Sequence, residues 1–175
     1  MTHLFEPLAI RGVTLPNRIL VSPMCEYSCT DGYANDWHFV HLGSRAIGGA
    51  ALVFTEATAV TPEGRISPQD LGIWSDAHVE PLARVVRFID AHGSVAGIQL
   101  AHAGRKGSTR PPWDKAGSIP KTEGGWRTPA PSALAFGDGY AVPEALTDDG
   151  IRATIGAFVD AARRARAAGF RVIEL

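Results

Sequence analysis

Side chains that can bind or tune an organic cofactor follow three apolar runs of the sequence. We expect the residues at the ends of these runs to lie together around one opening of the folded chain, which we call the mouth. They are Pro23, Met24, Cys25 and Tyr27 after the first run, Glu56, Ala57 and Thr58 after the second, and Gln99 and His102 after the third. Cysteine, tyrosine, glutamine and histidine around an apolar opening suit a planar, hydrogen-bonding organic cofactor better than a hydrated metal ion. Neither the G-x-G-x-x-G dinucleotide fingerprint nor the G-x-x-x-x-G-K-[ST] phosphate loop occurs in the chain.

Each of these residues also has a purely structural interpretation. Cys25 taken alone is typical of a buried small hydrophobic residue, and Gln99 on a buried strand could simply satisfy a backbone group. Glu56 is a candidate acid or base, but a structural carboxylate with a partner is the better prediction. His102 and Arg105 either orient the mouth or make structural hydrogen bonds. The residues alone therefore leave the catalytic role of the mouth open.

The two cysteines, Cys25 and Cys29, lie in one short segment. Their placement is unlike the disulfide framework of a small secreted domain, so we expect two reduced thiols. A metal site built on this pair is disfavoured, because structural zinc sites use four ligands with characteristic spacing, and a helix better explains the nearby His38 and His41. The sequence therefore predicts no metal.

The elements that must position the mouth are repeated βα units. Nearly continuous apolar runs predict four strands of a parallel sheet buried on both faces, at residues 18–23, 50–57, 95–103 and 171–175. Helical spacing and capping residues predict three crossover helices, at residues 35–48, 75–93 and 147–169. Gly12, between two short β-prone runs, predicts a hairpin over residues 8–16 that plugs one end of the sheet or barrel.

The segments that follow the predicted strands, residues 24–34, 58–74 and 104–146, are much longer than those that precede them. In parallel α/β proteins the carboxyl ends of the strands form the face that binds ligands. The longest segment is predicted to be a lid or a subunit contact rather than a separate domain. The tryptophans are predicted to be packing residues, with the last two also candidates for lining the lid: Trp37, Trp74, Trp113 and Trp126.

The composition disfavours several classes of partner. Seventeen Lys and Arg residues against eighteen Asp and Glu residues give a formal net charge of −1, without the basic stripe that attracts nucleic acid or an anionic membrane. No apolar run approaches the ~18 residues of a membrane-spanning helix, and the first residues lack the basic flank and cleavage site of a signal peptide. We therefore expect a cytoplasmic protein, whose 45% hydrophobic residues can form a core.

Five segments, in this order, resemble the amino-terminal half of the old yellow enzyme family: LFEPLAI, LPNRILVSPMCEYS, DWHFVHLGSRA, EATAVTPEGRISPQDLGIWSDAH and GIQLAHAGRK. The resemblance covers essentially the whole chain, and several unrelated motifs agree in both sequence and spacing. Cys25 stands where the yeast-type members carry threonine, which is similar to the branch that contains the bacterial xenobiotic reductases and the thermophilic-like ene-reductases.

The resemblance implies an FMN-dependent (β/α)8 barrel that transfers hydride from NADPH, through flavin N5, to the β-carbon of an activated alkene such as an enone. It implies that Pro23, Met24 and Ala57 contact the flavin through their main chains. It also implies that Gln99 pairs with the pyrimidine part of the isoalloxazine ring. Cys25 would lie near N5 and modulate the redox potential, and Tyr27 would offer its hydroxyl to the bound carbonyl compound.

By the same resemblance, residues 1–175 are the amino-terminal half of one flavin-binding barrel domain, with about four βα units after the hairpin; a complete barrel takes about 250 residues or more. The family's substrate-binding histidine pair, its proton-donating tyrosine and its phosphate-binding loops would lie on a complementary carboxyl-terminal polypeptide, without which this chain would be inactive. The completed enzyme would be a homo-oligomer. Two alternatives remain: a non-catalytic half-barrel that binds a partner through its open strand edges, and part of a larger flavin and iron–sulfur reductase such as a dienoyl-CoA reductase.

Overall fold

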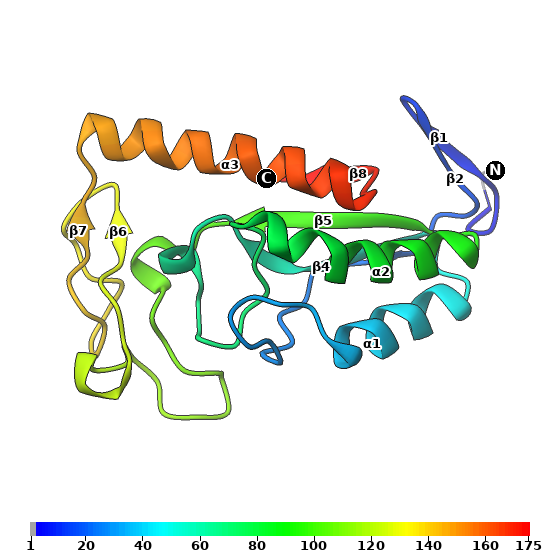
Figure 1. The fold of residues 1–175 in the computed structure, drawn as a ribbon. Coiled ribbons are helices and arrows are strands. Elements are labelled where there is room, and N and C mark those ends of the chain that lie inside the picture. The colour runs from blue at the N-terminus through cyan, green and yellow to red at the C-terminus, as the bar shows by residue number, and fades with distance from the viewer. Residues whose placement is uncertain (1–2) are drawn as a thin grey trace.

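A computed structural model describes residues 3–175, which form a four-stranded parallel sheet with three helices (Figure 1). The strands pair in the order β3 (Leu20–Val21), β4 (Leu52–Ala59), β5 (Val95–Ala101) and β8 (Val172–Glu174). Because this spatial order follows the chain order, the sheet is wound in one direction, as in a βα barrel, without the reversal that a doubly wound sheet contains. The predicted α/β class is confirmed.

Side-chain caps determine where the three helices begin. The helices are α1 (Asp36–Ile47), α2 (Val79–Ala91) and α3 (Asp148–Ala168). Asn35 and Thr147 accept hydrogen bonds from backbone N–H groups in the first turns of α1 and α3, and Ser75 caps a short 3-10 turn that leads into α2. Gly169, with a φ of 100°, ends α3 in the left-handed conformation that favours glycine. All three predicted helices are present.

The two faces of the sheet are buried against different partners. One face packs on all three helices, and its cluster contains Val53 and Ile98 of the strands. The other face contributes Leu52, Phe54 and Val95 to a second cluster, which has no helical member among residues 3–175. Since successive side chains of a strand point to opposite faces, this second face is the one that a closed barrel would enclose. We call it the interior face.

A β-bulge in β4 changes which of its side chains reach the interior face. Phe54 pairs with Gly97, but the next paired residue, Ala57, pairs with Gln99, so β4 contains one extra residue over this stretch. Strict alternation from Phe54 would put Glu56 on the interior face. The extra residue instead puts Ala57 there beside Gln99 and turns Glu56 toward α1.

A hairpin covers the amino-terminal end of the interior face. Strands β1 (Leu8–Ile10) and β2 (Val13–Leu15) pair antiparallel. Leu15 is 1% exposed and lies in the same cluster as Leu52, Phe54 and Val95. The predicted hairpin is confirmed, and Leu15 packs it against this end of the interior face.

The strands differ from their predicted bounds at several ends. The first pairs only over Leu20–Val21, because Asn17 caps the Ile19 N–H at 2.9 Å on one side and Pro23 has no N–H on the other. The third ends at Ala101, where a turn held by the side chain of His102 begins. The second continues to Ala59, so Thr58 lies inside this strand and not after it.

Residues 104–146, predicted as a loop, contain short regular elements. Strands β6 (Pro129–Ala130) and β7 (Glu144–Ala145) pair in parallel, and 3-10 turns occur at Gly104–Lys106 and Lys121–Glu123. Two-residue strands have no alternation pattern to predict them. Figure 1 shows β6 and β7 beyond the carboxyl end of β5, at the end of the sheet opposite the hairpin. None of the helices within residues 3–175 combines the length and the apolarity needed to cross a bilayer.

Candidate active site

Three residues form a row across the interior face, near the carboxyl ends of β4, β5 and β8. Ala57 pairs with Gln99 in register, and Gln99 pairs with Glu174. We call these three residues the interior row. Gln99 is half-buried, and its Nε2 donates a hydrogen bond of 2.7 Å to the Glu174 carboxylate. A side-chain amide, which can both donate and accept, therefore lies in the middle of this row beside a small alanine.

Cys25 lies near the interior row, because the Ala57 backbone and the Tyr27 hydroxyl are close enough to its sulfur to lower the pKa of the thiol slightly against the other influences. Burial raises the pKa of the Cys25 thiol to about 11, and the carboxylates of Asp70 and Glu56 add to this rise. At neutral pH the sulfur is therefore an uncharged, polarisable thiol and a weak donor, not a nucleophilic thiolate. The structure thus brings Cys25, Ala57 and Gln99 together.

We expect alkylation of Cys25 by iodoacetamide to be slow at pH 8 and to accelerate until the pH approaches about 11, because only the thiolate reacts. An unperturbed thiol has a pKa of about 8.5, so the unfolded chain ionises first, and this group lowers the free energy of unfolding as the pH rises from there toward the folded value. The Cys25→Ala variant, which keeps only Cys29, gives the background rate. A rate that already levels off near pH ~9 would show an unperturbed thiol.

Tyr27 reaches the mouth from a strained backbone conformation. Its φ is 49°, in the left-handed region that tyrosine rarely adopts. Its ring meets Trp113 edge-on with 5.3 Å between the ring centroids. Burial raises the pKa of Tyr27 to about 12, so the hydroxyl keeps its proton at neutral pH. Because Trp113 belongs to the segment 104–146, this segment contacts the mouth there.

Pro23 and Met24 connect the edge strand β3 to Cys25. Pro23 is half-buried and Met24 is 49% exposed. Neither side chain is charged, and the ring of Pro23 fixes its own φ, which stiffens this connection. They give the mouth an uncharged rim on the side of the first strand.

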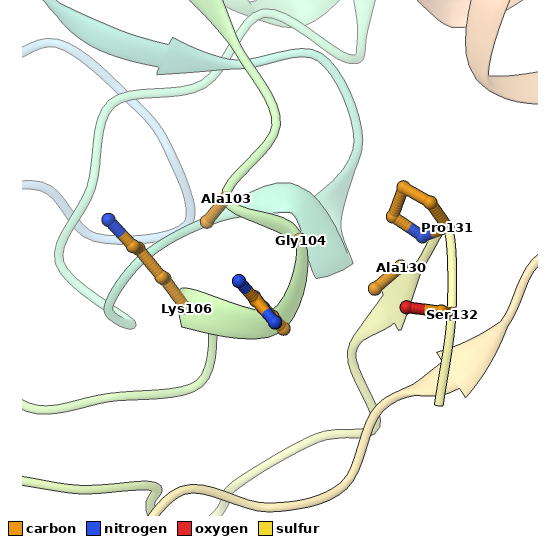
Figure 2. Close-up of a pocket in the computed structure, with 7 residues that line it drawn as sticks. Ala103, Gly104, Lys106, Ala130, Pro131 and Ser132 are labelled. Carbon is orange, nitrogen blue, oxygen red and sulfur yellow. The ribbon is translucent and has the colours of Figure 1, made fainter. Parts of the chain in front are cut away.

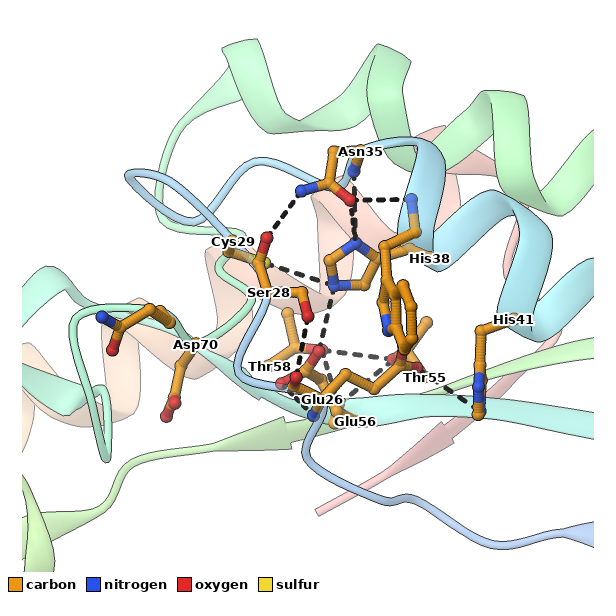
Figure 3. A network of polar contacts seen from close by, with 12 residues as sticks. Glu26, Ser28, Cys29, Asn35, His38, His41, Thr55, Glu56, Thr58 and Asp70 are labelled. Atoms are coloured by element: carbon orange, nitrogen blue, oxygen red, sulfur yellow. Dashed lines mark hydrogen bonds and ion pairs between the residues drawn. The ribbon is translucent and has the colours of Figure 1, made fainter. Parts of the chain in front are cut away.

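A buried network lies on the helix side of the sheet, behind the mouth (Figure 3). Glu56 lies 3.1 Å from His38 Nε2, and the Cys29 sulfur lies 3.3 Å from the same nitrogen. The Thr58 hydroxyl donates to the Glu56 carbonyl oxygen at 2.8 Å. Glu56 is 1% exposed. The prediction that Glu56 is a structural carboxylate with a partner is confirmed, and His38 and His41 both lie on the predicted helix.

Cys29, His38 and Glu56 also form a group within residues 3–175 whose side chains could share a metal ion. Structural zinc sites use four ligands, and these are three. Hydrogen bonding accounts for the arrangement of all three side chains. The structure separates the two cysteines by role, since Cys29 joins this network whereas Cys25 lies beside Ala57.

His102 has a structural role in the turn after β5. Its Nδ1 accepts a hydrogen bond from the Gly104 N–H at 3.1 Å. Its ring lies so close to Gly64 that a Cβ there would be 2.8 Å from the ring. Burial lowers the pKa of His102, so the ring is neutral at physiological pH. Of the two roles weighed for this residue, the contacts support the structural one.

Arg105 and Lys106 border a cavity of about 390 Å³ between the turn after β5 and the segment around β6 (Figure 2). The opposite wall is formed by Ala130, Pro131 and Ser132. Arg105 is exposed, and its guanidinium lies over the ring of Phe136. The lining of this cavity does not include Cys25, Ala57 or Gln99, so it is separate from the interior row.

Two of the four tryptophans pack against other parts of the protein, and two are largely exposed to solvent. Trp74 covers Gly72, and Trp126 Nε1 donates to the Glu63 carbonyl oxygen at 2.9 Å, as expected of packing residues. Trp37 is 58% exposed, so the predicted packing role is wrong for it, whereas Trp113 is 75% exposed but contacts the Tyr27 ring at the mouth. Both lie outside the two clusters that the sheet buries.

Glu174 is the residue of the site that the sequence interpretation missed. It is the last residue of β8 and the hydrogen-bond partner of Gln99. The signal was available, because the fourth apolar run also ends at the carboxyl face of the sheet.

Comparisons with known proteins identify relatives of the chain. Residues 3–175 match the NADH:flavin oxidoreductase / NADH oxidase family. The chain is 47% identical over 176 residues to NADPH dehydrogenase of Geobacillus thermodenitrificans, covering 99% of this chain and 47% of that protein. It is 49% identical over 176 residues to NADPH dehydrogenase of Bacillus cytotoxicus, covering 99% of this chain and 46% of that protein.

Solved structures of the same kind share the fold. Morphinone reductase superposes with a TM-score of 0.81 at 30% identity, covering 97% of this chain and 46% of that protein. The old yellow enzyme from Trypanosoma cruzi superposes with a TM-score of 0.81 at 31% identity, covering 97% of this chain and 49% of that protein. The predicted architecture, one half of a (β/α)8 barrel, is confirmed, as is the resemblance to old yellow enzymes.

The chain spans about half the length of the relatives that it matches. The five motifs, the single direction of strand order and the match over residues 3–175 lead to one conclusion. The chain belongs to the NADH:flavin oxidoreductase / NADH oxidase family.

Proposed function

We propose that the chain supplies the amino-terminal half of an FMN-dependent oxidoreductase, in which hydride passes from NADPH through the flavin to the β-carbon of an activated alkene such as an enone. The observation that carries this proposal is the interior row with the uncharged Cys25 thiol beside it. Family membership supports a flavin. The names of the Geobacillus and Bacillus relatives support NADPH, and one structure of morphinone reductase is a complex with tetrahydroNAD.

The groups of the interior row fit a flavin ring. The Gln99 side chain offers a donor and an acceptor to the polar pyrimidine edge. Ala57 has a small side chain, so a flat ring can approach its main chain, and Pro23 and Met24 add an uncharged rim on the side of the first strand. When bound, FMN supplies the hydride carrier. In this proposal the amide of Gln99 orients the ring and stabilises the negative charge of the reduced form.

Cys25 and Tyr27 are proposed to act at the reactive edge of the ring and on the substrate. The neutral thiol of Cys25 offers a polarisable contact and a weak donor there. Tyr27 keeps its proton because burial raises its pKa to about 12, so its hydroxyl can donate to the carbonyl oxygen of an enone. Such a hydrogen bond withdraws electron density from the alkene and makes its β-carbon more electrophilic.

The proposed enzyme includes a complementary polypeptide that closes the barrel. Strands β3 and β8 are the edges of the sheet within residues 3–175, and an unpaired strand edge accepts further strands. The complement would add the remaining βα units, so that residues 1–175 form half of one flavin-binding domain. We propose that the completed enzyme is a cytoplasmic homo-oligomer.

Joining residues 1–175 to the part of the Geobacillus thermodenitrificans relative that follows its aligned region gives a completed protein that tests the proposal. We expect it to purify with bound FMN and to oxidise NADPH when cyclohexenone is added. Each part alone is the control and is expected to be inactive. A completed protein that folds but binds no flavin would contradict the proposal and favour a half-barrel that binds partners through its strand edges.

A further inference from the structure

We propose that Glu56 is a positioning residue, which holds segment 25–27 (Cys25, Glu26 and Tyr27) at the mouth by tying its backbone to helix α1. The inference rests on the proposed function, because the mouth is where that proposal puts the flavin and the alkene. Glu56 faces the helix side of the sheet, so it acts on the mouth through other residues.

The Glu56 carboxylate bridges two segments that are separate in the sequence. Its Oε2 accepts a hydrogen bond from the Glu26 backbone N–H at 3.3 Å, and its Oε1 accepts one from His38 Nε2 at 3.1 Å. Figure 3 shows Glu56 between these two partners. Glu56 and His38 are each 1% exposed, so water cannot readily replace either bond if it is lost.

Segment 25–27 needs such an anchor because Tyr27 is strained at a φ of 49°. On the far side of Tyr27, the Ser28 hydroxyl donates to the Glu26 carbonyl oxygen at 2.8 Å, and Asn35 Nδ2 donates to the Ser28 carbonyl oxygen at 2.6 Å. The Glu26 carboxylate also lies 3.7 Å from His41 Nε2 of α1, but the bond from the Glu26 N–H to Glu56 is the anchor of the backbone on the Cys25 side. Its loss therefore frees Tyr27 to relax and Cys25 to move with it.

A second histidine of the chain provides an internal comparison. His38 and His78 each occupy the third position after a helix-capping residue and accept a hydrogen bond from its backbone N–H at 3.2 Å. They are 1% and 2% exposed. They differ at Nε2, which faces Glu56 in His38 and the Asp31 carbonyl oxygen in His78. His78 therefore has the same capping role without the contact to Glu56.

The variants Glu56→Gln and Glu56→Leu separate the effect of the shape of the Glu56 side chain from the effect of its charge. The Asn35 N–H donates to His38 Nδ1, which leaves Nε2 as the donor to Glu56. In Glu56→Gln, the new carbonyl oxygen can accept from Glu26 and the new amide can donate to His38, if His38 changes tautomer. The tautomer change exchanges one cap contact for another, because Nδ1 then donates to the Asn35 Oδ1, 3.0 Å away, and no longer accepts from the Asn35 N–H. Glu56→Leu can make neither contact.

The rate of amide hydrogen exchange in the peptide that contains Glu26 measures how firmly the Glu26 N–H is held by Glu56. It can be measured in the completed protein with or without flavin. We expect Glu56→Leu to speed exchange at Glu26 and Tyr27 about tenfold, and Glu56→Gln to keep it near that of the unsubstituted protein. With FMN bound, we expect Glu56→Leu to shift the visible flavin spectrum and to raise KM for cyclohexenone several-fold, with a smaller change in kcat. Glu56→Gln should restore both.

His38→Asn and His78→Asn form the matched control pair. Asparagine places its amide oxygen near the position of Nδ1 and so keeps the cap, but it is too short to reach the position of Nε2. Only His38→Asn should reproduce the faster exchange and the shifted spectrum, and it provides the test if Glu56→Leu does not fold.

Unchanged exchange at Glu26 in folded Glu56→Leu protein would overturn the proposal, as would equal effects of His38→Asn and His78→Asn. Faster exchange with an unaltered spectrum and KM would also overturn it, because the anchor would then not position the mouth. If the unsubstituted completed protein binds no flavin, the proposed function fails, whereas the exchange comparison still decides whether Glu56 anchors segment 25–27.

Discussion

Gln99→Ala in the completed protein is expected to raise the dissociation constant of FMN about 10- to 100-fold, because an unsatisfied polar group costs about 1–3 kcal/mol and each 1.4 kcal/mol is a factor of ten. Gln99 lies in the middle of the interior row and presents the side-chain amide there. Gln99 is a polar residue of the site and belongs to neither hydrophobic cluster of the sheet. The effect should therefore appear in flavin affinity more than in folding stability.

Titration of the flavin-free protein with FMN, followed by quenching of flavin fluorescence, measures this constant. Gln69→Ala is the matched control, because Gln69 is the other glutamine of the chain and is exposed in the segment after β4. It should leave the affinity unchanged. An unaltered affinity in Gln99→Ala as well would remove Gln99 from the cofactor site.

Leu15→Ala is expected to lower the free energy of unfolding of the completed protein by about 2–5 kcal/mol, the range for truncating a fully buried leucine. Leu15 is 1% exposed and joins the hairpin to Leu52, Phe54 and Val95 on the interior face. Its loss opens a cavity at the amino-terminal end of the barrel.

Urea titration monitored by circular dichroism measures this free energy. Thr14→Ala is the control, because Thr14 is the exposed neighbour of Leu15 in the same strand. It should change the free energy of unfolding by no more than about 0.5 kcal/mol. Equal effects of the two substitutions would show that the hairpin does not plug the interior face.

The helix ends were predictable because their determinants are local. Asn35, Ser75 and Thr147 each bond to backbone N–H groups within their own first turn, and Gly169 needs no tertiary contact to adopt a positive φ. The hairpin was predictable for the same reason. Local chemistry therefore determined the order and type of the main elements.

The β4 bulge was not predictable from the sequence. Residues 50–57 are apolar except for Thr55 and Glu56, and no local sequence pattern indicates where the extra residue lies. The bulge nevertheless decides that Ala57 and not Glu56 joins Gln99. It depends on pairing with β5 and on the contact of Glu56 with His38, both of which are tertiary.

The candidate site was predictable as a set of positions but not as a set of contacts. The rule that ligands bind at the carboxyl ends of parallel strands selects Cys25, Ala57 and Gln99. It does not reveal that Cys29 belongs to a different network from Cys25, or that Trp113 meets Tyr27. These contacts join segments that come together only when the loops are folded, so no local sequence pattern predicts them.

A crystal structure of the completed protein with FMN would show whether the flavin binds on the interior face, as we claim. We expect the isoalloxazine ring on the interior face, with its pyrimidine edge about 3 Å from the Gln99 amide and with Ala57 and Cys25 beside the ring. A flavin bound on the helix side of the sheet, or in the cavity bordered by Arg105 and Lys106, with Gln99 still paired only to Glu174, would contradict the claim.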